Sequence, residues 1–143
     1  MIIDGQIPGR FAFADDVCVA FGTHEPISPG HMLVVPREEI DQFTHLDPAL
    51  FAHLSQVAQT IGRAQELAFP GRRAIQFILG FEVPHTHIHV VAATSEEDAR
   101  PGRAKKDATS DELDAGVEAV RAALIELGFG SNVPTAIGSP ELG

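Results

Sequence analysis

Histidines stand at alternate positions in one short segment of this chain, and no other feature restricts the local backbone as strongly. They are His85, His87 and His89, three of the seven histidines in the sequence. Alternate side chains of an extended strand point to the same face, so a strand over 85–92 places three imidazoles on one surface. Ile88 and the two valines after the last histidine are apolar, and buried polar groups among them need partners. We therefore expect a β-sheet with a histidine-lined functional surface.

Imidazole chemistry fits such a surface. The unperturbed pKa of histidine is close to neutrality, so a row of imidazoles can supply a nucleophile, a proton donor and hydrogen bonds to one substrate group. A purely structural role is one alternative, although it requires partners for three rings at once.

A metal site is the second alternative. His85 and His89 lie about 13 Å apart along a straight strand that rises about 3.3 Å per residue. Metal–nitrogen bonds are about 2 Å long, so three rings cannot share one ion unless the strand bends, although two neighbouring rings can. The residues that follow are Val91, Ala92 and Ala93, and none of them is an acidic ligand. We expect no metal and no cofactor, with a small metalloenzyme that uses two of the histidines left open.

The rest of the sequence predicts a mixed fold. Apolar residues recur at spacings of three and four between the Asp-Pro pair at 47–48 and the Pro-Gly pair at 70–71, which predicts a long amphipathic helix. Thr109 and Glu112 have capping-box spacing before a second apolar stripe over 110–127. Hairpin-like connections favour an α+β domain with an antiparallel sheet of about five strands. The expected strands are 10–14, 17–21, 31–35, 74–79 and 85–92.

The length of 143 residues fits one domain that buries a core without disulfides, since there is a single cysteine. We assign the domain to 1–128 and expect residues 129–143, rich in Gly, Ser and Pro, to form a loose, flexible tail. Cys18 lies in an apolar run and is expected to be buried without a chemical role. His53 falls off the main apolar stripe of the long helix and is expected at the surface.

Charge and hydropathy limit the classes of partner that this protein can bind. Ten basic against twenty acidic residues give a net charge of −10, which opposes DNA or RNA as the main partner. A small nucleotide remains compatible, because a few local groups can hold it. No apolar stretch approaches the length of a membrane span, and the first residues lack a basic region followed by an apolar one. We expect a cytoplasmic protein without a membrane partner.

The histidine segment and its surroundings resemble the histidine triad (HIT) family of nucleotide hydrolases and transferases. Upstream, in the order of that family, stand Ile-Pro-Gly at 7–9, a hairpin over 10–21 and Pro-Gly-His at 29–31. Gly-Phe-Glu-Val-Pro at 80–84 resembles a bacterial branch of the family. The resemblance covers about residues 2–93 and implies a HIT-like antiparallel fold and a homodimer.

The resemblance also implies catalytic roles for the triad. His87 would attack the α-phosphorus of a nucleoside 5′-phosphate derivative and form a covalent nucleotidyl-histidine, from which water releases the monophosphate. His89 would bond the phosphoryl or bridging oxygen, His85 would support the ring geometry, and His31 would approach the triad. The substrates implied are a nucleoside phosphoramidate, an adenylylated compound or a dinucleoside polyphosphate.

Other positions bear on substrate binding. Ile2, Phe21 and Leu33 match base-pocket positions of the family. Thr23 stands where many relatives have an aspartate that binds the ribose. A hydroxyl cannot accept two hydrogen bonds as strongly as a carboxylate, so this change weakens the expected ribose recognition.

Two glutamates also depart from the family pattern. Glu82 stands where many relatives have a polar residue, and its charge either repels phosphate or orients a triad imidazole, of which we slightly favour the second. The N-terminal cysteine pair of the family's zinc site is absent, and Glu39 replaces a histidine ligand, so no zinc is expected. Thr23 and Glu82 keep a rival open, a nucleotide-binding module without catalysis.

Overall fold

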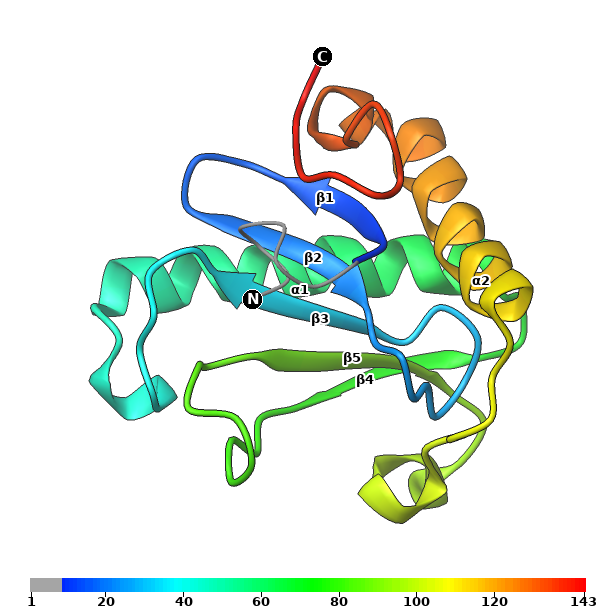
Figure 1. Ribbon diagram of the computed structural model, residues 1–143, viewed down its shortest axis with the longest axis horizontal. Helices are drawn as coiled ribbons and strands as arrows, with labels where there is room; N and C mark the ends of the chain where they lie inside the picture. The colour runs from blue at the N-terminus through cyan, green and yellow to red at the C-terminus, as the bar shows by residue number, and fades with distance from the viewer. Residues whose placement is uncertain (1–8) are drawn as a thin grey trace.

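The structure is a computed structural model that describes residues 9–143, and the predicted base-pocket residue Ile2 lies outside the described residues. The strands are β1 (Phe11–Ala14), β2 (Cys18–Gly22), β3 (Met32–Pro36), β4 (Arg73–Phe77) and β5 (Ile88–Ala93), and the helices are α1 (Pro48–Ala68) and α2 (Ser110–Leu124). All neighbouring strands pair antiparallel, in the order β1-β2-β3-β5-β4. Helix α1 lies across one face of the sheet, and α2 packs against α1 and β1 (Figure 1).

Short helical turns connect these elements. They are η1 (Phe43–His45), η2 (Glu96–Ala99), η3 (Pro101–Arg103), the π-helical turn η4 (Ile125–Phe129) and η5 (Gly130–Asn132). No helix within residues 9–143 combines the length and the apolar character that crossing a membrane requires.

The sheet divides its side chains between two faces. In β3, Met32 and Val34 belong to the large core beneath α1, whereas Leu33 and Val35 join a small apolar cluster on the opposite face. Leu33 pairs with His89 of β5, so His89 also points away from α1. We call the side under α1 the helix face and the side that carries His89 the triad face.

Helix α1 fixes the segment that leads into β3. Its buried Gln65 donates from Nε2 to the carbonyl oxygens of Gly30 (2.9 Å) and Val90 (2.8 Å), which ties the helix to β5 and to the residue before His31. Gly30 has a φ of 73°, and a Cβ there would lie 2.5 Å from the ring of Phe69. Both the backbone conformation and the close packing therefore require glycine at this turn.

The predicted antiparallel α+β architecture is confirmed, but β5 begins later than expected, at Ile88. Before it, the His85 amide donates to Val83 O (2.8 Å), and the Thr86 amide and hydroxyl both donate to Ile40 O (2.7 and 2.8 Å). These bonds hold the chain in a turn, so it does not pair with β3 there. The prediction that one strand carries all three histidines on one face is therefore wrong.

The prediction of a loose tail over 129–143 is wrong for residues 129–137. The Phe11 amide donates to Ile137 O (2.7 Å), and Asn132 Nδ2 donates to Ala14 O (3.1 Å). Strand β1 is an edge of the sheet, and unpaired backbone groups at an edge need partners. The C-terminal segment provides partners for two of them, and the packed domain extends beyond residue 128.

Candidate functional site

A cavity of about 460 Å³ lies where β2 and β4 end and where β3 and β5 begin. Three imidazoles line it, from His31, His87 and His89. The rest of the lining comes from the ends of β2 and β4 and from the loops around residues 79–83 and 104–106. The fold thus gathers three histidines, but the third is His31 instead of His85.

The hydrogen bonds of His31 define the tautomers of two rings. The Ile27 amide donates to His31 Nδ1 (3.0 Å), so this nitrogen holds the lone pair, and the proton of the neutral ring is on Nε2. His31 Nε2 lies 3.0 Å from His89 Nδ1 and donates to it. His89 therefore carries its own proton on Nε2 and presents a hydrogen-bond donor.

Burial keeps this pair neutral. Burial, and then the neighbouring His89, lower the pKa of His31 to about 3. Burial, and then the neighbouring His87, lower the pKa of His89 to about 4. Phe77 of β4 stacks on the His89 ring with centroids 4.7 Å apart and planes at 16°, which fixes the plane of that ring. The pair is thus a fixed array of neutral donors at physiological pH.

His87 has the opposite arrangement. Its Nδ1 lies 2.8 Å from the carbonyl oxygen of His85, which can only accept, so Nδ1 carries the proton and Nε2 holds the lone pair. Its half-buried ring lies 4.9 Å from the His89 ring, centroid to centroid. A lone pair on one imidazole and an N–H donor on the next therefore stand side by side. This combination suits attack on an electrophile whose oxygens gain negative charge.

His85 lies outside the cavity lining. Its ring is buried, and Nε2 donates to the carbonyl oxygen of Pro36 (2.7 Å) at the end of β3. Its own carbonyl oxygen accepts from His87. His85 therefore contacts the cavity residue His87 through its backbone and not through its ring.

The other predicted binding residues divide into two groups. Thr23 and Glu82 line the cavity with the three imidazoles. Phe21 and Leu33 lie in the small apolar cluster of the triad face and do not line the cavity. Both lie on the same face of the sheet as the histidines, and Leu33 is the cross-strand neighbour of His89.

Glu82 does not orient a triad ring here. Each of the three triad imidazoles bonds to another group, and within residues 9–143 no hydrogen bond or ion pair involves the exposed Glu82 carboxylate. No cation of the described part of the chain is therefore in direct contact with this negative charge at the cavity.

Sequence reasoning missed Glu25, Phe77 and Lys106, which also line the cavity. Lys106 belongs to the loop before α2, and the neighbouring Lys105 amide holds this loop by donating to Pro26 O (2.8 Å). The basic cluster at 100–106 was a visible signal, but the sequence alone does not show that its last lysine reaches the triad.

The sequence of this chain is similar to those of known proteins. The model of the HIT domain family matches residues 4–96. An uncharacterized HIT-like protein of Methanocaldococcus jannaschii is 31% identical over 94 residues, which cover 63% of this chain and 73% of that protein. A second, from Saccharolobus solfataricus, is 32% identical over 101 residues, with 67% and 73% covered.

Solved structures share the fold. A zinc-bound histidine triad family protein from Mycobacterium smegmatis superimposes with a TM-score of 0.75 at 23% identity, covering 88% of this chain and 91% of that one. A hypothetical histidine triad nucleotide-binding protein from Sulfolobus tokodaii gives a TM-score of 0.73 at 21% identity, with 88% and 90% covered.

Proposed function

Because the chain belongs to the HIT domain family, we propose that it is a nucleotidyl hydrolase or transferase that acts at the α-phosphorus of a nucleoside 5′-phosphate derivative. The observation that carries this proposal is the pairing of the His87 Nε2 lone pair with the His89 Nε2–H donor in one cavity. A nucleophile next to a fixed donor is what displacement at phosphorus requires.

Two displacements account for the reaction. His87 Nε2 forms a bond to the α-phosphorus while the bond from phosphorus to the leaving group breaks, and His89 Nε2–H donates to a phosphoryl or bridging oxygen. A departing amine takes up a proton from solvent. Water or another acceptor then attacks phosphorus, the phosphorus–nitrogen bond breaks, and a nucleoside monophosphate or its ester is released. When water is the acceptor, its proton leaves to solvent and His87 returns to its neutral form.

The charges at the cavity favour substrates of low charge. Lys106 offers one cation for phosphate, whereas Glu25 and Glu82 add two carboxylates. Each additional phosphate on a ligand increases repulsion from those carboxylates. Among the implied substrates, a phosphoramidate or an adenylylated compound therefore fits better than a dinucleoside polyphosphate.

The test is turnover of adenosine 5′-phosphoramidate, followed by release of AMP. His87→Asn should reduce kcat by about 10³-fold or more, because the nucleophile is lost, while nucleotide binding persists in a thermal-shift assay. Near-native kcat in this variant would contradict the mechanism.

A binding module without catalysis is the second candidate, and the observation that favours it is Thr23 at the cavity in place of a carboxylate. Nucleotide binding by the native chain, with no turnover of a phosphoramidate, an AMP ester or a dinucleoside polyphosphate, would support the binding module. Turnover that depends on added metal, with metal bound by His87 or His89, would support the metalloenzyme.

The homodimer belongs to the same proposal. The backbone edge of β1 is covered by the C-terminal segment, whereas β4 forms the other end of the sheet and pairs only with β5 among the described strands. An open edge is suited to pairing with a second copy. Analytical ultracentrifugation should therefore give a dimer mass. Proline at Gln76, whose backbone amide faces the same side as that of Ala74 and therefore away from β5, should shift it to monomer if this edge is used.

A further inference from the structure

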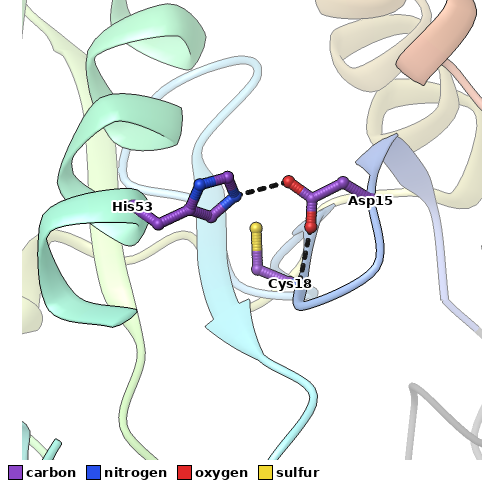
Figure 2. Close-up of side chains that lie close together, drawn as sticks. All are labelled: Asp15, Cys18 and His53. Carbon is purple, nitrogen blue, oxygen red and sulfur yellow. Dashed lines mark hydrogen bonds and ion pairs between the residues drawn. The ribbon is translucent and has the colours of Figure 1, made fainter. Parts of the chain in front are cut away.

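The helix face carries a second histidine-containing cluster, far from the triad in the sequence. Asp15 lies in the turn between β1 and β2, Cys18 begins β2, and His53 lies on α1. One ligand atom from each of the three lies within 4.8 Å of the others. Figure 2 shows the Cys18 thiol directed into the space between the His53 ring and the Asp15 carboxylate. The fold thus brings a sulfur, a nitrogen and an oxygen donor together from three elements.

We propose that Asp15, Cys18 and His53 bind a zinc-type divalent cation, with water as the fourth ligand, and that this ion fastens the β1–β2 hairpin to α1. This site shares no residue with the triad and lies on the other face of the sheet. His53, predicted at the surface, is therefore assigned a role that its position in the sequence did not indicate.

The carboxylate is held in place for this role. Asp15 Oδ1 accepts from the amides of Val17 (2.9 Å) and Cys18 (2.8 Å), which fixes the turn. The other oxygen, Oδ2, lies 2.6 Å from His53 Nε2. Oδ1 therefore maintains the hairpin. Oδ2 is available to bind an ion in place of the N–H of His53.

The distances require only a small opening. Zinc–nitrogen and zinc–oxygen bonds of about 2.0–2.2 Å and zinc–sulfur bonds of about 2.3 Å place tetrahedral ligands roughly 3.3–3.7 Å apart. His53 Nε2 and Asp15 Oδ2 must separate from 2.6 Å by about 1 Å. The His53 side chain is 40% exposed and that of Asp15 is 18% exposed, so an ion and a water can enter from their side while the thiol stays buried.

The charges balance. Binding converts the Cys18 thiol to a thiolate and releases its proton to solvent, while His53 keeps one proton by shifting it to Nδ1. The thiolate and the Asp15 carboxylate then neutralise a divalent ion. Burial, and then the Asp15 charge, raise the pKa of the Cys18 thiol, so the proton stays on sulfur until a metal displaces it.

The donor set also selects the class of ion. Calcium and magnesium prefer all-oxygen sites, whereas one thiolate and one imidazole suit zinc and the cobalt that substitutes for it. A positive charge lies close to the proposed site, because Arg37 Nε donates to the Asp15 carbonyl oxygen (3.0 Å). Its single charge is outweighed by the two negative ligands of the bound state.

Cobalt(II) titration of the chelator-treated full chain tests the proposal. We expect a thiolate-to-cobalt charge-transfer band that saturates at one equivalent, and competition with a chromophoric chelator should then give the zinc affinity. Cys18→Ala should abolish the band. His53→Gln and Asp15→Asn should weaken zinc binding by more than about 100-fold, beyond the 10–100-fold typical when only a partner of a ligand is lost. Asp15→Asn retains an oxygen that can accept the hydrogen bonds from the Val17 and Cys18 amides, so we expect this variant to fold.

His87→Asn is the matched control, because it removes a histidine from the other cluster. Zinc binding that persists in His87→Asn and rises about tenfold per pH unit, as the loss of one thiol proton requires, would support the site. Absence of the charge-transfer band at stoichiometric cobalt would overturn the proposal. Binding lost in His87→Asn but retained in His53→Gln would also overturn it, since the metal would then be on the triad.

Discussion

The two faces of the sheet hold histidine in opposite electrostatic surroundings. On the triad face, His31 and His89 bond to each other, and burial keeps both neutral. On the helix face, His53 bonds to the carboxylate of Asp15 beside a buried thiol. An imidazole that faces another imidazole is restricted to one tautomer, whereas one that lies beside a carboxylate and a thiol belongs to a set of possible metal ligands. The same residue type thus serves different chemistry according to its partner.

The largest expected effect that separates the faces is on catalysis. His31→Leu removes the donor to His89 Nδ1, so the His89 tautomer is no longer fixed and Nε2–H is not assured. We expect kcat on a phosphoramidate to fall about 10–100-fold, as when the partner that orients a functional imidazole is lost. His53→Gln, on the other face, is the control and should retain native kcat. Equal losses in the two variants would remove the functional distinction between the faces.

The second effect is on stability against acid. The folded pKa values of His31 and His89, about 3 and 4, lie below the ordinary 6.5. The unfolded chain therefore takes up protons first, and stability is lost as pH falls from 6.5 towards those values. The buried His31 alone gives a limiting slope of about 1.4 kcal/mol per pH unit. Urea unfolding from pH 7 to pH 4 should show at least this slope, because His89 adds to it, and His31→Leu should reduce it.

The Asp15 carboxyl is expected to change the stability of the fold in a lower pH range than the two histidines do. Burial by itself raises the pKa of this carboxyl, but hydrogen bonds from His53, Val17 and Cys18 outweigh that effect and lower the pKa below 3.8. Its contribution to stability is therefore present above pH 3.8 and is lost as pH falls through the folded pKa. Asp15→Asn should therefore leave unchanged the part of the slope between pH 7 and pH 4 that His31→Leu removes. A change in that part would show that the two faces are coupled.

The helices and strands could be predicted from the sequence, but not every contact between side chains that are distant in the sequence. The 3.6-residue period of α1 and the short apolar runs of β1 to β3 report burial directly, so the helix, the strands and the α+β class could be predicted. The position of His85 could not, because the bonds of Thr86 to Ile40 come from a loop more than forty residues away. The Asp15, Cys18 and His53 cluster was missed for the same reason, since its members meet only after α1 packs on the sheet.

The next prediction concerns the sugar. Thr23 lines the cavity, where, among residues 9–143, its hydroxyl accepts only a long bond from the Glu25 amide (3.3 Å). Thr23→Asp should tighten binding of ribonucleotides more than of 2′-deoxynucleotides, by up to about 1–2 kcal/mol for a charge-assisted bond. Isothermal titration with matched AMP and dAMP measures the difference. Equal changes for both sugars would show that residue 23 does not contact the ribose hydroxyls.

The smallest expected effect concerns Glu82, whose exposed carboxylate lies at the cavity without bonding to a triad imidazole. A like charge near phosphate costs free energy that grows with ligand charge, so Glu82→Gln should improve binding of a dinucleoside polyphosphate a few-fold and of AMP less. The charge is exposed to water, so added salt should shrink the gain. If kcat instead falls for every substrate and the charge preference is unchanged, Glu82 orients a triad imidazole in the complex, as the sequence first suggested. The structure favours the electrostatic outcome because His85, His87 and His89 already have other partners.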